Sequence, residues 1–197
     1  PFFLRLGAFR EDIVKALIMA AGYATRLYPL TKNRAKPLLP IAGRPIVDYI
    51  ADSLDRVAEI DRIFVVTNHR FAPSFARWAG KRRGRAPVTV IDDGTVSDAD
   101  KLGAIGDIRY VLAKEGIDDD LFVVLGDNLF DLDLTRIVPF FREKGITVAA
   151  YDVADREAAK LYGILGVDGA GRVVNFVEKP ADPPTTLAAI GIYLFPR

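Results

Sequence analysis

An apolar run, Val14–Met19, ends in a segment of small residues, Ala20-Ala21-Gly22-Tyr23-Ala24, and the chain then presents Arg26. The run has the length and composition of a buried strand. Small side chains let backbone N–H groups approach an anion, and Arg26 and Lys36 supply fixed positive charge. The pattern therefore predicts a phosphate-binding loop at the end of a strand. The alternative is an ordinary strand-to-helix turn with both cations in solvent.

Short apolar runs alternate with segments of helical spacing along the chain. This alternation is typical of α/β proteins, in which helices cover a mostly parallel sheet. The predicted strands are Val14–Met19, Arg62–Thr67, Val88–Ile91, Leu121–Leu125 and Ile146–Asp152. The predicted helices span residues 45–58, 71–78 and 134–144, with Phe140 and Phe141 on the buried side of the last one.

After Asp152 the pattern changes to that of antiparallel strands. Tyr162–Val167 and Arg172–Val177 flank Asp168-Gly169-Ala170-Gly171, which predicts a hairpin, and Ala188–Phe195 reads as a further strand. We therefore predict one α/β domain over residues 14–197 with antiparallel strands in its C-terminal half. Residues 1–13 are interpreted as a poorly placed N-terminal tail.

Composition narrows the classes of function. A chain of 197 residues fits one domain, and 27 basic against 26 acidic residues leave a net charge of +1. Such a balance favours neither nucleic acid nor a membrane as partner. The basic run Lys81-Arg82-Arg83-Gly84-Arg85 has no interleaved aromatic residues, so we interpret it as a solvated helix end and loop. No cysteine is present, which excludes a disulfide framework and fits the cytoplasm.

Two further motifs carry charged groups at predicted strand ends. Gly126-Asp127 follows the run Val123-Val124-Leu125, and a carboxylate at that edge suits Mg²⁺ bound together with substrate phosphates. Glu178-Lys179 precedes Pro180, where Glu can accept hydrogen bonds from hydroxyls and Lys can meet a phosphate. Taken singly, the Gly126-Asp127 motif is also compatible with a capped turn, and the Glu178-Lys179 motif is more typical of an exposed pair before a turn.

Together these motifs resemble the sugar-1-phosphate nucleotidylyltransferases, or nucleotide-sugar pyrophosphorylases. The resemblance covers residues 14 to 195 and is glucose-1-phosphate thymidylyltransferase-like. The residues that match the family pattern are Gly22, Thr25-Arg26-Leu27, Pro29, Thr31, Lys36, Leu38, Pro40, Leu125-Gly126-Asp127-Asn128, Tyr162-Gly163, Glu178-Lys179-Pro180 and Gly191-Ile192-Tyr193.

The resemblance implies a three-layer, Rossmann-like fold and an attack by a sugar-1-phosphate on the α-phosphorus of a nucleoside triphosphate. It implies catalytic roles for Arg26, Lys36 and Asp127, of which Asp127 would hold Mg²⁺ as cofactor. The implied nucleotide-binding residues are Ala20, Ala21, Gly22, Thr25, Arg26 and Gly103. The implied sugar-phosphate-binding residues are Tyr162, Gly163, Glu178, Lys179 and Tyr193. We expect dTTP or UTP with glucose-1-phosphate as the substrates, and we leave a homo-oligomer open.

The chain departs from the family pattern at several positions. Ala24 stands for a usual glycine and Ala35 for a usual proline, while Asp92-Asp93-Gly94 replaces a region that often holds a base-reading Gln. The family also carries a second metal aspartate beyond the Gly-Ile-Tyr strand, whereas this chain ends at Arg197. We therefore expect a domain that lacks the C-terminal part of the family's domain.

Three alternatives stay open at this point. One is a cytidylyltransferase that acts on phosphocholine or inositol phosphate, and another is a nucleotide-binding module without activity. The third is a metal-dependent glycosyltransferase, because Asp131-Leu132-Asp133 spells the Asp-x-Asp motif of those enzymes. The single histidine, His69, is interpreted as a turn residue.

Overall fold

The computed structural model describes residues 13–197, so almost all of the predicted N-terminal tail lies outside the described residues. The strands are β1 Val14–Met19, β2 Pro40–Ile41, β3 Arg44–Pro45, β4 Ile60–Thr67, β5 Val88–Asp92, β6 Asp120–Leu125, β7 Thr147–Asp152, β8 Gly163–Val167, β9 Val173–Glu178 and β10 Leu187–Phe195. The α-helices are α1 Ile46–Asp55, α2 Ala72–Lys81, α3 Gly103–Glu115, α4 Ile137–Lys144 and α5 Arg156–Ala159. Short 3-10 turns cover Thr25–Leu27, Lys36–Leu38 and Leu134–Arg136.

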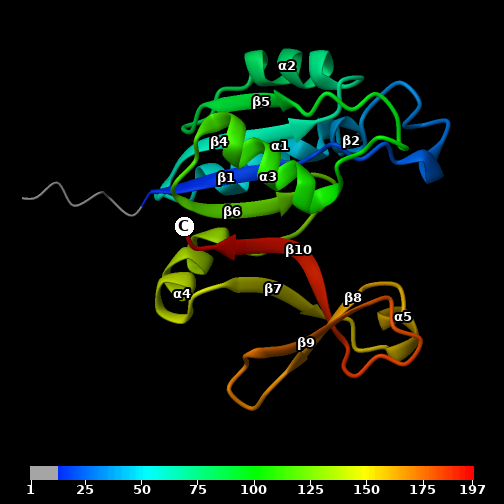
Figure 1. Cartoon of the computed structure of the whole chain (residues 1–197), viewed down its shortest axis with the longest axis vertical. Coiled ribbons are helices and arrows are strands. Elements are labelled where there is room, and N and C mark those ends of the chain that lie inside the picture. The colour runs from blue at the N-terminus through cyan, green and yellow to red at the C-terminus, as the bar shows by residue number, and fades with distance from the viewer. Residues whose placement is uncertain (1–12) are drawn as a thin grey trace, which may run out of the picture.

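Eight strands form the central sheet, in the order β5-β4-β1-β6-β10-β8-β9, with β7 paired to β10 (Figure 1). The first four of these strands run parallel, and β10 is antiparallel to β6, β7 and β8. The parallel part therefore has the strand order of a Rossmann-like sheet, in which the order reverses at β1. The predicted α/β architecture, with antiparallel strands in the C-terminal half, is confirmed.

Helices cover both faces of the parallel part, which gives three layers (Figure 1). On one face, α1, α2 and α4 pack their apolar residues against the sheet, among them Leu54, Phe75 and Phe141. On the other face, α3 packs through Val111 against Leu17 and Val123. Beyond β10, the β8–β9 hairpin and α5 form a smaller body below the main one.

Three details of the sequence prediction are wrong. Phe140 is 52 % exposed and points away from the core, because only its neighbour Phe141 lies on the inner side of α4. The predicted strand at residues 146–152 is real, but β7 pairs antiparallel with β10, so the parallel pattern ends before Asp152. Helix α3 was not predicted, since its first turn holds two glycines and its outward Ile105 breaks the apolar stripe.

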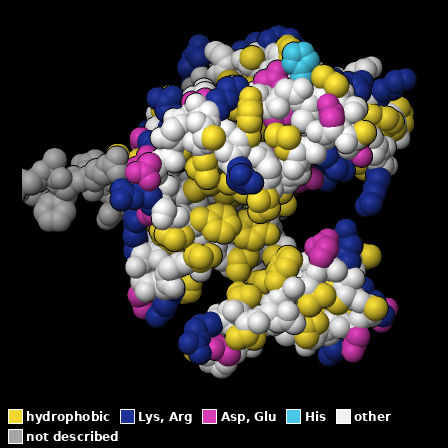
Figure 2. Space-filling model, viewed as in Figure 1, with side chains coloured by type: hydrophobic (Ala, Val, Ile, Leu, Met, Phe, Trp, Pro, Cys, Tyr) yellow, Lys and Arg dark blue, Asp and Glu magenta, His cyan; other side chains and the backbone are white. Residues whose placement is uncertain are grey.

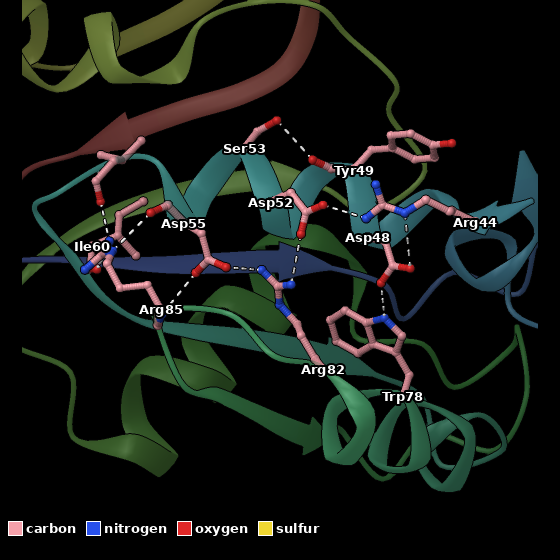
Figure 3. A network of polar contacts seen from close by, with 12 residues as sticks. Arg44, Asp48, Tyr49, Asp52, Ser53, Asp55, Ile60, Trp78, Arg82 and Arg85 are labelled. Atoms are coloured by element: carbon pink, nitrogen blue, oxygen red, sulfur yellow. Dashed lines mark hydrogen bonds and ion pairs between the residues drawn. The ribbon is translucent and has the colours of Figure 1, made fainter. Parts of the chain in front are cut away.

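The basic run at residues 81–85 is also not simply solvated (Figure 3). The Arg82 side chain is only 7 % exposed and forms ion pairs with Asp52 and Asp55 of α1. Arg85 donates to the backbone carbonyls of Asp55 (3.0 Å) and Ile60 (2.7 Å). These two arginines therefore fasten the loop after α2 to the end of α1, and their role is structural.

Candidate active site at the switch point of the sheet

The C-terminal ends of β1 and β6 lie side by side at the point where the strand order reverses. Met19 is paired with Leu125, and the N–H of Gly126 donates to the carbonyl of Met19 at 2.8 Å. In open α/β sheets, this crevice is the usual place for a ligand. The small-residue loop after β1 and Asp127 after β6 therefore meet there, as the sequence predicted.

Two buried polar side chains hold the loop after β1; the sequence analysis gave Thr31 as a family match without a role and did not predict Asn68. Thr31 is fully buried, and its hydroxyl donates to the carbonyl of Ala24 at 2.7 Å. Asn68, also buried, donates to the carbonyl of Ala21 at 2.9 Å. Ala24 has φ +48°, the left-handed conformation that glycine adopts without strain. The loop therefore keeps the glycine-type geometry, although alanine stands there.

Lys36 and Asp127 form an ion pair at this edge. Lys36 Nζ lies 2.7 Å from Asp127 Oδ2, and the two side chains are 36 % and 42 % exposed. Lys36 opens the 3-10 turn Lys36–Leu38, whose Pro37 is buried. The structure thus brings together two of the three predicted catalytic residues.

A cavity of about 360 Å³ extends between the loop after β1 and the N-terminal part of α3. Of the predicted nucleotide-binding residues, Ala20, Ala21, Gly22 and Gly103 line this cavity, with Lys36 and Asp127 at its side. The structure places Thr25 and Arg26 in an exposed 3-10 turn that does not line the cavity. Lys101 and Asp107 line it as well, and neither was predicted.

A second cavity, of about 970 Å³, lies between the main body and the β8–β9 hairpin. In the space-filling view the molecule is hollowed between these two bodies (Figure 2). Tyr162, Gly163, Glu178 and Lys179 line this cavity, as the resemblance implied. Lys36, Leu125 and Asp127 line both cavities, so the Lys36–Asp127 pair stands where they join.

Tyr193 is not among the residues that line either cavity. It is half-buried on the α3 side of the sheet, where its ring stacks on Phe195 with centroids 6.1 Å apart. Burial raises the pKa of its hydroxyl, and the negative charge of Glu178 adds to that rise. Its predicted contact with the sugar phosphate stays a prediction.

The end of β9 holds its charged pair in an unusual backbone. Lys179 has φ +46°, which is rare for a residue with a side chain, and its N–H donates to the carbonyl of Tyr162 at 3.0 Å. Its Nζ lies 3.2 Å from Glu178 Oε1. Strained backbone conformations persist only where the surrounding structure holds them, and they are concentrated at functional sites.

Two signals from the sequence have structural roles here. Asp133 caps the turn Leu134–Arg136 by accepting from the N–H (3.1 Å) and hydroxyl (2.7 Å) of Thr135, which lowers the pKa of its carboxyl. An Asp-x-Asp metal motif is therefore not supported. His69 Nδ1 lies 2.7 Å from Asp92 Oδ2 in an exposed pair.

Fold and site define the chain as an α/β protein with a cavity at the switch point of its sheet. A family model described as nucleotidyl transferase matches residues 15–197. The chain belongs to the nucleotidyl transferase family.

The relatives extend beyond this chain. A UTP–glucose-1-phosphate uridylyltransferase of Synechocystis is 33 % identical over an alignment of 190 residues that covers 92 % of this chain and 49 % of the relative. A glucose-1-phosphate adenylyltransferase of Trichlorobacter lovleyi is 31 % identical over an alignment of 201 positions, gaps included, that covers 92 % of this chain and 48 % of the relative. The chain thus spans about half the length of these curated relatives.

The fold is also that of solved structures. A UDP-glucose pyrophosphorylase crystallised with UDP-glucose superposes with a TM-score of 0.76 at 22 % identity, over 93 % of this chain and 76 % of that one. Within residues 13–197, no helix is both long and apolar enough to cross a membrane.

Proposed function

We propose that the protein transfers a nucleotidyl group from a nucleoside triphosphate to a sugar-1-phosphate, with UTP or dTTP and glucose-1-phosphate as the first pair to test. One observation carries the proposal: the two cavities meet at Lys36 and Asp127. A two-substrate transfer needs that arrangement, because each substrate requires its own cavity and the reacting phosphates must meet at one charged point. The names of the relatives support the same class of substrates.

The chemistry is a displacement at the α-phosphorus. A phosphate oxygen of the sugar-1-phosphate forms the new P–O bond, the bond to the β-phosphate breaks, and pyrophosphate leaves with the bonding pair. Backbone amides at Ala21 and Gly22 are suited to bind phosphate oxygens. Lys36 would neutralise charge that builds around the α-phosphorus, and Arg26 would bind the leaving pyrophosphate.

Magnesium fits the residues present if the nucleotide brings most of its ligands. Asp127 offers one hard carboxylate at the junction of the cavities, and Mg²⁺ often takes one or two carboxylates with substrate phosphates completing the shell. Within residues 13–197, no group of three or more acidic, histidine or cysteine side chains is arranged to hold a metal alone. When bound, the ion would supply further charge neutralisation at the phosphates.

In the second cavity, Glu178 and Lys179 would bind different parts of the sugar-1-phosphate. The carboxylate of Glu178 can accept hydrogen bonds from sugar hydroxyls, and the ammonium of Lys179 can pair with the sugar phosphate. The cytoplasmic location, and the exclusion of nucleic acid and membranes as partners, are further parts of the proposal that rest on composition.

The test is a pyrophosphate-release screen of UTP, dTTP, CTP, ATP and GTP against sugar-1-phosphates, phosphocholine and inositol phosphate. Release with a sugar-1-phosphate supports the proposal, and release only with phosphocholine or inositol phosphate favours the cytidylyltransferase alternative. Tight nucleotide binding without release favours the inactive binding module. Asp127→Ala should abolish release, whereas Asp182→Ala, on a side chain 95 % exposed, should not.

A further inference from the structure

Two buried carboxyl groups face each other behind the first cavity. Asp93 follows β5, Asp107 lies in α3, and they are 7 % and 6 % exposed. Asp93 Oδ1 accepts from the N–H and the hydroxyl of Thr95, both at 2.7 Å. Asp93 Oδ2 and Asp107 Oδ1 are fully buried and have no donor. Neither carboxyl has an ion-pair partner within the part of the chain that the structure describes.

A proton shared between Asp93 and Asp107 explains how both carboxyl groups can be buried without another donor. Two adjacent carboxylates in a dry site cannot both be ionised, and one proton between them satisfies both buried oxygens. Burial raises the pKa of Asp107 to about 6, and the charge of Asp93 and a hydrogen bond to it add to the rise. A proton held between Asp93 Oδ2 and Asp107 Oδ1 leaves the other oxygen of Asp107 as a hydrogen-bond acceptor.

That remaining oxygen reaches the cavity. Asp107 lines the cavity, and its Oδ2 is not among the fully buried atoms and has no partner in the protein. A ligand that fills the cavity displaces water from this oxygen, and an acceptor left without a partner is then costly unless the ligand supplies a donor. A negatively polarised oxygen repels phosphate, so it suits a neutral part of a nucleotide that carries a donor.

The neighbouring walls favour a flat ring over a ribose. Six residues that line the cavity carry no side chain beyond Cβ, and they leave smooth walls along which a planar base can lie; they are Ala20, Ala21, Gly22, Ala24, Gly103 and Ala104. Family membership leaves the base open, because the relatives above are named for uridylyl and adenylyl transfer.

We propose that Asp107, positioned by Asp93, accepts a hydrogen bond from an N–H group of the nucleobase and so sets the base selectivity of the site. This inference rests on the proposed function. A base that turns only carbonyl oxygens toward α3 is rejected, because two acceptors would face each other. The ligand is thus a nucleotide whose ring N–H or amino group points at α3, such as the N3–H of uracil or thymine.

The test compares ligands with and without that donor. Calorimetry without a sugar phosphate gives the Kd of UTP, of N3-methyl-UTP and of inorganic tripolyphosphate; if another base binds better, its N-methylated analogue replaces the uridine pair. The wild type should prefer the unmethylated nucleotide at least about tenfold. Asp107→Ala should bring that ratio close to one and leave the Kd of tripolyphosphate within about twofold.

Asp107→Asn is the conservative variant. Its amide NH₂ can donate to Asp93 in place of the shared proton, while its carbonyl oxygen faces the cavity, so the preference for the unmethylated base should persist. An unchanged ratio in Asp107→Ala overturns the inference and leaves the proposed function standing. An equal loss of tripolyphosphate and UTP affinity also overturns it, because the residue would then act on the phosphates or the fold. A wild type that binds no nucleoside triphosphate overturns both proposals.

Discussion

Lys36 Nζ lies 2.7 Å from Asp127 Oδ2, although 91 positions separate the two residues in the chain. Each lies close to the C-terminal edge of the parallel sheet, one in the turn that follows the β1 loop and the other directly after β6. The ammonium of Lys36 is thus paired with the Asp127 carboxylate, the group that would bind a metal ion. Metal binding at Asp127 must compete with Lys36 and would free the lysine for the phosphates.

Lys36→Met tests this relationship. We expect the rate of pyrophosphate release to fall about 10²- to 10³-fold, because a fixed charge at the reacting phosphate is lost. The affinity of the free protein for Mn²⁺, measured by electron paramagnetic resonance, should rise, because Asp127 loses its competing cation. A loss of Mn²⁺ binding together with activity would contradict the assignment. Lys144→Met, on α4, is the matched control and should change neither quantity.

The sequence predicts the parallel half of the fold well for a physical reason. Strands buried on both faces are continuous apolar runs, so β1 and β6 can be recognised in the sequence. Because these strands are parallel, their C-terminal ends lie at the same edge of the sheet. Helix α3 was not predicted, because its buried residues are Asp107 and Val111, and a buried Asp does not contribute to an apolar periodicity.

Motifs that lie directly at a strand end could be predicted from the residues themselves, and the resemblance added residues elsewhere, such as Gly103 and Tyr162. Gly22 and Asp127 were found from such strand-end motifs, whereas the lining role of Asp107 depends on how α3 packs. The resemblance implied a sugar-phosphate contact for Tyr193. Residues alternate across a strand, and its side chain lies on the α3 face, so that contact stays a prediction. The pairing of Lys36 with Asp127 has no local signal at all.

Ala24→Gly should stabilise the protein. Ala24 has φ +48°, where a Cβ costs about 1–2 kcal/mol, and glycine removes that strain while it adds some unfolded-state entropy. We expect a net gain of about 0.5–1 kcal/mol in the free energy of unfolding by urea. Ala76→Gly, on the exposed side of α2, should instead cost about 1 kcal/mol. A loss at both positions would mean that the loop is unstrained.

Arg82→Met should destabilise the fold. Removal of the guanidinium leaves Asp55, 15 % exposed, without its charge partner (Figure 3). Leaving a largely buried charge unpaired costs about 3 kcal/mol, less whatever solvent returns, and urea unfolding measures it. Arg83→Met is the control, because Arg83 is exposed and donates only to backbone carbonyls. Equal effects of both substitutions would rule out the ion pairs as the cause.

The pH dependence of stability should change in Asp107→Asn. The folded state holds a proton on Asp107 up to pH about 6, whereas the ordinary pKa of the carboxyl is 3.8. The folded protein therefore binds more protons than the unfolded chain between these values, and wild-type stability falls as pH rises through this window. From pH 4 to pH 7 the variant should gain about 2 kcal/mol relative to the wild type. Asp182→Asn should follow the wild type, and parallel curves for Asp107→Asn would refute the raised pKa.

Gly163→Ala should impair the sugar side of the site alone. A Cβ on Gly163 would lie 2.7 Å from Phe176 Cζ and 3.0 Å from Glu178 Oε2, so the ring and the carboxylate must move. The displaced Glu178 would weaken the hold on the sugar hydroxyls, and we expect the KM for the sugar-1-phosphate to rise about tenfold, since a charge-assisted hydrogen bond contributes about 1.5–3 kcal/mol. The Kd of the nucleoside triphosphate should stay unchanged, because Gly163 does not line the first cavity. Gly169→Ala, in the same hairpin with open space around its Cβ, should behave as the wild type. If nucleotide affinity fell in step with the sugar phosphate, the two cavities would not be separate binding sites.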